Sequence, residues 1–206
     1  SKVDKKFYQE LEKIFENDKF TIENTERLIH SHGQETFKDI YKVLYKSIDR
    51  IVDLVFYPES EEDVKKIIEI ALKYNVCLIP YGGGTNVTRA LSVPDNENRT
   101  VVSIDTRRLS KIEWINKEDR RVCVEAGITG KNLDELLKKE GFMIGHEPDS
   151  VELSTIGGWI ATNASGMKKN KYGNIEDIVE NVHLVTPKGE INQIKPISRG
   201  SIGFKP

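Results

Sequence analysis

The stretch Val76-Cys-Leu-Ile-Pro-Tyr-Gly-Gly-Gly-Thr-Asn86 joins a short apolar run to three consecutive glycines. The apolar run predicts a buried strand that ends at the glycines. Three glycines cost chain entropy, so they favour a place where the backbone turns through positive φ or where a ligand approaches bare backbone. Amide N–H groups in such a loop bind phosphate oxygens. A plain turn between strands explains the same residues, because short glycine motifs are weak evidence by themselves.

The residues that precede this stretch predict a strand–helix–strand unit. The run Ile51–Tyr57 is apolar and β-branched and stops at Pro58, which is typical of a strand. Ser60 is suited to cap the N-terminus of the helix that follows, and Asn75 is suited to end that helix in a left-handed conformation. We therefore expect a right-handed parallel βαβ unit. A further short strand is predicted over Thr100–Asp105.

The N-terminal part of the chain predicts helices. Phe7, Leu11, Ile14 and Phe15 recur at the spacing of one helix face. After a break at His32-Gly33, a second set of apolar residues has the same periodicity: Phe37, Ile40, Tyr41, Leu44 and Tyr45. We expect residues 1–48 to form a helical segment that packs on a larger domain.

Residues 49–206 predict that larger domain, in two parts. We expect a first subdomain over 49–110, around the glycine loop, and a second over 111–206 that begins a mainly antiparallel sheet. The elements expected in the second part are a hairpin over 111–125, a helix within 127–141 and a terminal hairpin over 179–194. An incomplete sheet has an unpaired edge, so we expect the chain to self-associate in solution.

The composition argues against several classes of protein. The 206 residues carry 31 Lys and Arg against 33 Asp and Glu, a net charge of −2, whereas a dedicated nucleic-acid-binding protein shows a basic excess. No apolar run approaches the roughly 20 residues of a membrane-spanning helix, and no targeting signal is visible. Cys77 and Cys123 cannot form a disulfide framework, and no histidine pair has zinc-ligand spacing, so no metal site is expected.

A second stretch, rich in small and hydroxylic residues, begins at Gly145. It comprises Gly145–Ser150 and Ser154–Gly166, in which Ser, Thr and Asn recur at helical spacing. This pattern favours contact with a ligand. Gly157-Gly158 is suited to open a short helix whose first amides face an anion. The alternative is a small-residue helix packed tightly against a sheet.

These motifs together resemble a known family. Pro80–Asn86 is similar to the diphosphate loop of FAD-binding domains of the vanillyl-alcohol-oxidase type. The more specific motifs resemble the alkyldihydroxyacetonephosphate synthase family, which makes ether lipids: Gly145–Ser150, Ser154–Ile160, Ala164–Asn170, Tyr172–Asp177 and Val124–Gly130. The likeness runs from about Arg27 to Gly189.

The resemblance implies an α+β FAD-binding domain of two subdomains, with the diphosphate of FAD between them. It implies a transferase that exchanges the acyl chain of acyl-dihydroxyacetone phosphate for a long-chain fatty alcohol, giving alkyl-dihydroxyacetone phosphate and fatty acid. In this family the flavin N5 is the nucleophile that holds the substrate carbon, without net redox change. The glycine loop contains no His or Cys, which agrees with the non-covalent FAD of the family.

The resemblance assigns two sets of residues to the cofactor. The diphosphate would be held by Pro80, Tyr81, Gly82, Gly83, Gly84, Thr85 and Asn86. The rest of FAD would be contacted by Asp149, Ser150, Ser154, Thr155, Gly157, Gly158, Thr162, Asn163, Ala164 and Ser165. We expect His146 to be a catalytic residue, since an imidazole at the flavin edge would move protons or pair with a substrate phosphate. The alternative role of His146 is a structural hydrogen bond to a neighbouring carbonyl.

The chain also departs from the family. A downstream flavin motif, a substrate-cap domain and a C-terminal region with a catalytic tyrosine and a histidine cluster have no counterpart here, and residues 197–206 lose the resemblance. We therefore expect these 206 residues by themselves to be inactive. By resemblance, the full-length protein would be a homodimer with peripheral membrane association. It would lie in the peroxisome or glycosome and serve plasmalogen synthesis.

Two other functions stay open at this point. An FAD-linked oxidase or dehydrogenase of a 2-hydroxy acid would share the glycine loop, but it explains Ala164–Asp177 less well. A non-catalytic fragment that folds without cofactor is the third alternative.

Overall fold

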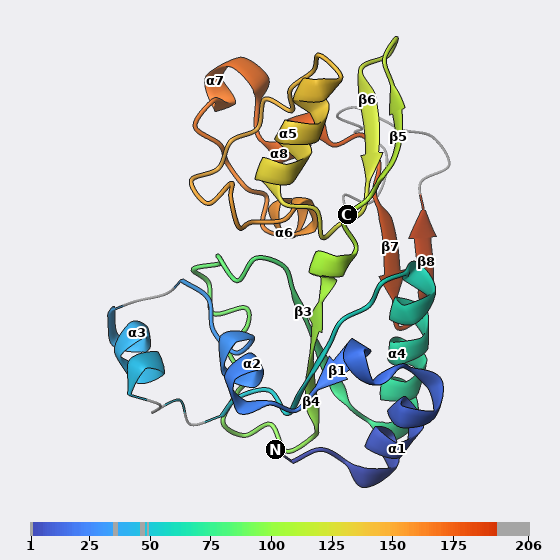
Figure 1. The fold of residues 1–206 in the computed structure, drawn as a ribbon. Helices are drawn as coiled ribbons and strands as arrows, with labels where there is room; N and C mark the ends of the chain where they lie inside the picture. The colour runs from blue at the N-terminus through green and yellow to red at the C-terminus, as the bar shows by residue number, and fades with distance from the viewer. Residues whose placement is uncertain (1, 35–36, 46–47, 49, 193–206) are drawn as a thin grey trace. The chain divides into compact units, whose positions relative to one another are not determined.

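The computed structural model describes residues 2–34, 37–45, 48 and 50–192, and the chain divides into two compact units, Ser1–Leu109 and Ser110–Pro206 (Figure 1). The first unit contains, in chain order, α1 (Lys5–Ile14), η1 (Asn17–Lys19), β1 (Phe20–Thr21), α2 (Asn24–Ile29), α3 (Phe37–Leu44), β2 (Leu54–Phe56), α4 (Glu61–Tyr74), β3 (Cys77–Tyr81), β4 (Val101–Asp105) and η2 (Thr106–Arg108). The three strands predicted on either side of α4 and at Thr100–Asp105 are therefore present.

The first unit is built on a four-stranded sheet with the order β1-β2-β4-β3. β2 and β3 both run parallel to β4, which lies between them, while β1 pairs antiparallel with β2. The predicted βαβ unit is thus confirmed as β2-α4-β3, with β4 inserted between its two strands. All five residues of β4 are buried, as expected for a parallel strand covered on both faces.

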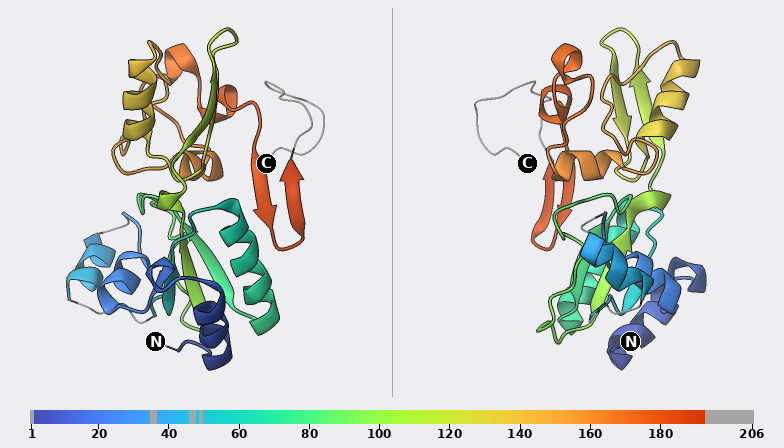
Figure 2. Two further views of the ribbon diagram at one scale, coloured as in Figure 1. Left: turned by 45° about the vertical axis from the view of Figure 1, so that its right-hand side comes forward. Right: turned by 90° about the vertical axis from the view of Figure 1, so that its left-hand side faces the viewer.

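Helices and a loop cover the two faces of this sheet. Leu54 and Phe56 of β2 join a core with residues of α1 and α4 on one face. Val55, between them, points to the other face, where it packs with Val93 and Val101. Figure 2 shows α2 on the side of the sheet opposite α4.

α4 begins and ends as its sequence predicts. The Ser60 hydroxyl accepts a hydrogen bond from the Asp63 amide at 3.1 Å. Asn75 ends the helix in the left-handed region, with φ 53°. These two local signals fix the length of the helix and hence the start of β3.

The N-terminal segment is helical with one exception. Phe7 and Leu11 of α1 are fully buried, and Phe15 packs edge-on against Phe56, whereas Ile14 is 45% exposed and lies outside the core. Phe20–Thr21 forms the edge strand β1, although this segment was expected to be wholly helical. A two-residue strand is too short to show a hydrophobic periodicity. It is a strand only because it pairs with β2 in the folded chain.

α3 has the predicted helical structure but not the expected burial. The apolar residues of the predicted helix face are exposed, with Phe37 at 92%, Leu44 at 71% and Tyr41 at 60%. Ile40 and Tyr45 are also exposed. The periodicity identified the helix correctly, but these side chains join no core of the first unit.

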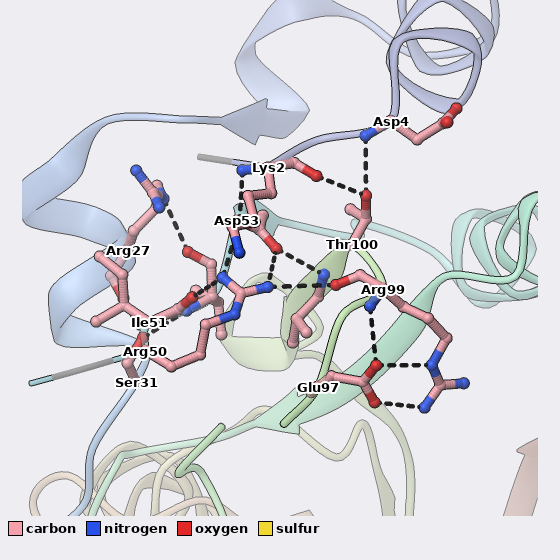
Figure 3. Close-up of polar contacts among 12 residues, drawn as sticks. Lys2, Asp4, Arg27, Ser31, Arg50, Ile51, Asp53, Glu97, Arg99 and Thr100 are labelled. Atoms are coloured by element: carbon pink, nitrogen blue, oxygen red, sulfur yellow. Dashed lines mark hydrogen bonds and ion pairs between the residues drawn. The ribbon is translucent and has the colours of Figure 1, made fainter. Parts of the chain in front are cut away.

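A buried carboxylate ties the N-terminus to β2 and β4 (Figure 3). Asp53 is fully buried and accepts hydrogen bonds from the amides of Lys2 at 2.7 Å and Val101 at 3.0 Å. Arg50 donates to both carboxylate oxygens of Asp53, at 2.9 and 2.5 Å. Burial alone would raise the pKa of Asp53, but the hydrogen bonds from Arg50, Lys2 and Val101 outweigh it and hold this pKa below its ordinary value.

The second unit contains β5 (Ile112–Asn116), β6 (Arg121–Val124), α5 (Gly130–Lys139), α6 (Ile156–Ala161), α7 (Lys169–Tyr172), α8 (Ile175–Ile178), β7 (His183–Thr186) and β8 (Gly189–Asn192). β5–β6 and β7–β8 form the two predicted antiparallel hairpins. Residues 193 and 194 of the second predicted hairpin lie outside the described residues. The core of this unit centres on Trp159, with Ile128, Leu133 and Ile175. Among the described helices, none combines the length and apolar character needed to cross a membrane.

Candidate functional site

The glycine loop follows β3 directly, at the carboxyl end of a parallel strand. Gly82, Gly83, Gly84 and Thr85 are half-buried. Within residues 2–34, 37–45, 48 and 50–192, their backbone N–H groups donate no hydrogen bond. Half-buried N–H groups without acceptors are suited to bind the oxygens of an anion.

The shape of this loop depends on Tyr81 and Gly84. Gly84 has φ +66°, and a Cβ atom built at this position would lie 2.4 Å from the Tyr81 hydroxyl. Tyr81 is buried, and burial raises its pKa. Its carbonyl accepts a hydrogen bond from the Thr106 hydroxyl at 3.0 Å. Only glycine combines this backbone angle with so close an approach by a neighbouring ring.

Pro80 and Asn86 lie at the two ends of the loop. Pro80 is in β3, is exposed, and pairs in register with Ile104. The Asn86 side-chain oxygen accepts a hydrogen bond from the Ala90 amide at 3.2 Å, so it is used within the chain. The half-buried Thr85 side chain has no hydrogen-bond partner among the described residues.

In the second unit, the hydroxylic stretch is held together by its own side chains. The Ser154 hydroxyl donates to the Ser150 carbonyl at 2.8 Å and accepts from the Trp159 ring nitrogen at 2.7 Å. Thr155 caps α6 by accepting from the Gly158 amide at 3.3 Å. Ser150, Ser154 and Thr155 are thus brought together around Trp159.

The first amides of α6 are occupied within the chain. The Ile156 amide donates to the Ile128 carbonyl at 3.0 Å, and the Gly157 amide donates to the Ala126 carbonyl at 2.8 Å. A Cβ atom at Gly157 would lie 2.8 Å from that of Ala126. This geometry is that of the alternative, a small-residue helix in tight packing. The assignment of Gly157 and Gly158 to FAD therefore rests on the resemblance alone and stays a prediction.

The remaining predicted residues are largely exposed. Asp149, Thr162, Asn163 and Ser165 are exposed, and Ala164 is half-buried. The Thr162 hydroxyl donates to the Gly158 carbonyl at 2.9 Å, and the Ser165 hydroxyl donates to the Asn174 side chain at 2.8 Å. Their role as cofactor contacts stays a prediction.

His146 is the most unusual polar group of the second unit. Its side chain is 3% exposed, and neither ring nitrogen has a hydrogen-bond partner among the described residues. The ring contacts Trp159 edge-on, with 4.9 Å between ring centroids. An unsatisfied buried polar group costs about 1–3 kcal/mol. The structure therefore does not show the hydrogen bond to a carbonyl that was the alternative role for this residue.

The surroundings of His146 keep its ring neutral. Burial lowers the pKa of His146, and Glu176 only partly opposes this effect. The Met167 amide donates a hydrogen bond to the Glu147 carbonyl at 2.8 Å, and Gly166 lies so close that a Cβ atom there would be 2.9 Å from the Glu147 amide nitrogen. His146 lines a cavity of about 360 Å³ together with Lys131, Glu135 and Lys168. A neutral imidazole with one free N–H and one free lone pair can both donate and accept a proton.

These observations fit a bound flavin dinucleotide. The loop in the first unit offers N–H groups to a diphosphate, and the second unit carries a buried imidazole that has no hydrogen-bond partner in the described part of the chain. Both features lie in motifs assigned to the cofactor from the sequence.

Comparison with known proteins decides the family. Residues 52–195 match the profile of the FAD binding domain family, which is more than half of the chain. The chain belongs to the FAD binding domain family. FAD is accordingly its cofactor. Like other members, it has a mixed helix and sheet architecture.

Within this family, the chain is similar to alkyldihydroxyacetonephosphate synthases. It is 48% identical to that of Caenorhabditis elegans, over 89% of this chain and 31% of the relative, and 40% identical to that of Trypanosoma brucei brucei, over 92% and 31%. A solved alkyldihydroxyacetonephosphate synthase structure superposes with a TM-score of 0.89 at 37% identity, covering 93% of this chain and 36% of that one. The chain spans about a third of the length of these relatives.

A second group of FAD binding domain relatives is more distant. The mitochondrial D-lactate dehydrogenase [cytochrome] of Arabidopsis thaliana is 32% identical, over 96% of this chain and 32% of the relative.

Residues that support the glycine loop were missed from the sequence. His30 is not among the residues that the sequence assigned to the site. In the structure the His30 ring lies 4.3 Å from the Tyr81 ring and bonds to Asp105. Only the strand register that brings Asp105 opposite Tyr81 could have revealed this contact.

Proposed function

We propose that this chain is the flavin-binding part of an ether-lipid synthase. The enzyme would exchange the acyl chain of acyl-dihydroxyacetone phosphate for a long-chain fatty alcohol, and release alkyl-dihydroxyacetone phosphate and fatty acid. The observation that carries the proposal is the gap in similarity: 48% and 40% identity to the two synthases against 32% to the dehydrogenase, over similar shares of this chain.

The chain's own residues would bind and orient the cofactor. The N–H groups of Gly82, Gly83 and Gly84 would hold the diphosphate, as their lack of internal acceptors supports. Residues 149–165 would contact the rest of FAD. When bound, FAD would supply a nucleophilic ring nitrogen that holds the substrate carbon while one chain leaves and the other enters, without net redox change.

His146 would move the proton that this exchange requires. The entering alcohol loses a proton, and a neutral imidazole with a free lone pair accepts one. The lowered pKa of His146 keeps that lone pair free at neutral pH. Pairing with the substrate phosphate is the other role that a buried donor N–H supports.

Oxidation of a 2-hydroxy acid is the second candidate function. The 32% identity to a D-lactate dehydrogenase over 96% of this chain favours it, but at a lower level than the synthases. The two functions differ in what happens to the flavin, since only the dehydrogenase reaction reduces it.

An isotope experiment separates the two candidates. The native protein, purified from its source, is incubated anaerobically with acyl-dihydroxyacetone phosphate and a deuterated fatty alcohol, and separately with D-lactate. The proposal predicts the deuterated chain in an ether product, with the visible spectrum of oxidised flavin restored once the substrate is consumed. Bleaching of the flavin by D-lactate, together with no labelled ether, would establish the dehydrogenase instead.

The cellular setting belongs to the same proposal. We infer a peroxisomal or glycosomal enzyme of plasmalogen synthesis, homodimeric in its full-length form and peripheral to the membrane. The resemblance supports this setting, because the long-chain alcohol is a membrane-soluble substrate. Density-gradient fractionation of source cells would test it, with recovery in the cytosolic fraction as the contrary result.

A further inference from the structure

The glycine loop is supported by a segment that lies outside the matched FAD binding domain region. That region begins at residue 52, whereas the support comes from residues 24–34, here called the α2 segment. The segment lies on one face of the sheet and contacts both ends of the loop, as described next (Figure 1).

At the far end of the loop, the α2 segment holds Asn86. The Gln34 amide donates a hydrogen bond to the Asn86 carbonyl at 2.9 Å. A Cβ atom at Gly33 would lie 2.2 Å from that carbonyl oxygen and 2.8 Å from the Asn86 side-chain nitrogen. The two backbones therefore touch at Gly33, and any side chain there would displace Asn86.

At the near end, the α2 segment supports Tyr81 through His30. The His30 side chain is fully buried, and its ring lies 4.3 Å from the Tyr81 ring. Tyr81 in turn lies against Gly84, with its hydroxyl at the position that a side chain would occupy. The order of contact is therefore His30, Tyr81, Gly84.

Hydrogen bonds at both ring nitrogens fix the orientation of His30. Nδ1 lies 2.7 Å from the Glu26 carbonyl and Nε2 lies 2.9 Å from the Asp105 carboxylate. Both ring nitrogens therefore have a hydrogen-bond partner within the first unit. The ring cannot turn away from Tyr81 without losing a buried hydrogen bond.

Asp105 is itself held in place. Arg107 donates to it from its amide at 2.9 Å and from its guanidinium at 2.6 and 3.0 Å. Burial would raise the pKa of Asp105, but the hydrogen bonds from His30 and Arg107 outweigh burial and lower it. The Arg107 guanidinium also lies 5.3 Å from the centre of the Tyr81 ring. Tyr81 is therefore fixed on one side by His30 and on another by Arg107.

We propose that the α2 segment is a positioning element of the FAD diphosphate site, with His30 and Gly33 as its positioning residues. His30 acts through Tyr81 and Gly33 acts through Asn86, so that residues 82–85 keep the conformation that leaves their N–H groups free. The inference rests on the assignment of the loop to the FAD diphosphate.

The test compares His30→Ala and Gly33→Ala in the full chain with His183→Ala as a matched control. His183 is exposed in β7, and its Nε2 lies 3.2 Å from the Glu190 carboxylate. The first readout needs no FAD: amide chemical shifts and hydrogen-exchange rates of Gly82–Thr85, measured by NMR. We expect exchange at these amides to rise about tenfold in both variants. Amides of α5 in the second unit, and those of the control protein, should be unchanged.

The second readout is the dissociation constant for FAD, measured by quenching of flavin fluorescence. We expect both variants to bind FAD about tenfold more weakly than the parent chain. A purely structural role would lower the melting temperature but leave the dissociation constant of the folded fraction unchanged.

Two contrary outcomes are distinguishable. Unchanged loop amides and unchanged FAD affinity in both variants would overturn the positioning role. Perturbed loop amides without FAD binding by the parent chain would keep the positioning role and overturn the diphosphate assignment. If His30→Ala does not fold, Gly33→Ala alone tests the positioning role. This variant changes the contact with Asn86 and opens no cavity.

Discussion

At the scale of single residues, Gly84 is the position where the glycine loop is most sensitive. We predict that Gly84→Ala lowers the free energy of unfolding by about 1–2 kcal/mol, because a left-handed backbone is costly for alanine. The new Cβ would also press against the Tyr81 hydroxyl and shift the loop. We therefore expect FAD affinity to fall about tenfold or more, as measured by fluorescence titration.

Gly141 supplies the control for this prediction. It has φ +82°, and a Cβ atom there would meet nothing within 4 Å. Gly141→Ala should lower stability by a similar amount and leave FAD affinity unchanged. An equal loss of FAD affinity in both variants would show that the effect is general instability.

His146 gives a prediction in which stability and function separate. We expect His146→Phe to leave the melting temperature of the chain unchanged or raised, because an apolar ring replaces a buried ring with no hydrogen-bond partner among the described residues. In the native protein the same change should reduce ether formation by about 100-fold or more, the usual contribution of a general base. A clear drop in melting temperature with full ether formation would assign His146 a structural role.

The pH dependence of stability provides a second check on His146. Its folded pKa is lowered, so below the ordinary histidine value of about 6.5 the unfolded chain binds a proton that the folded chain does not. The contribution of His146 to the free energy of unfolding is therefore present above about pH 6.5 and is lost as the pH falls below it. His146→Phe should remove that part of the pH dependence, as measured by urea unfolding between pH 7 and pH 5.

The roles of some single residues could be predicted from the sequence, and those of others could not. Ser60 and Asn75 were predicted correctly, because a cap acts on its own helix. The role of His30 was not predicted, because it depends on Tyr81 and Asp105. These residues are distant from His30 in the chain and meet it only in the folded unit. The missing partners of His146 are likewise visible only once its neighbours are placed.

At the scale of elements, the buried Asp53 joins the N-terminus to β2 and β4 (Figure 3). We predict that Asp53→Ala lowers the free energy of unfolding by about 3–5 kcal/mol at pH 7, because it leaves Arg50 without its buried partner. Asp18→Ala is the control, since its carboxylate is exposed and its ion pair with Arg108 is long, at 3.9 Å. Exposed ion pairs of this kind contribute little to stability. Urea unfolding measures both.

The folded pKa of Asp53 is lowered, so its contribution is present above the ordinary value of about 3.9 and is lost as the pH falls through it. The difference between parent and Asp53→Ala should therefore shrink below about pH 4. A difference that is constant with pH would assign the effect to packing and not to the charge.

Elements were predicted well where the signal was local. The strands, the hairpins and α4 follow from apolar runs, turns and caps. The amides of α6 were predicted to face an anion, yet Ala126 and Ile128 accept from Gly157 and Ile156, and no short motif encodes those partners. α3 shows the limit of periodicity, which identifies a helix but not what covers its apolar face.

At the scale of the whole molecule, the two hairpins of the second unit bear on self-association. Each forms a two-stranded sheet within the described residues. Exposed strand edges pair with one another. We therefore predict oligomers whose proportion rises with concentration in size-exclusion chromatography with light scattering.

A lysine on a hairpin strand provides the control for self-association. Ile191 of β8 is 43% exposed, and a charge there should disfavour edge pairing. Ile191→Lys should therefore shift the chain toward monomer. A monomer at all concentrations in the parent chain would show that these edges are not used.

The family could be predicted from the sequence, whereas the details of the site could not. The resemblance came from several short motifs, of which Ala164–Asn170 and Tyr172–Asp177 were the most specific, and the match over residues 52–195 agrees with it. The support of the loop by the α2 segment lies outside that match and depends on contacts between distant residues.

Titration of the purified chain with FAD tests whether the glycine loop binds the cofactor. The flavin absorption band and fluorescence are followed as FAD is added, with Gly84→Ala in parallel. We expect saturable binding of one FAD per chain, and weaker binding by the variant. A flavin signal that never saturates, or one that is identical in the parent chain and Gly84→Ala, would contradict the assignment of the glycine loop to FAD.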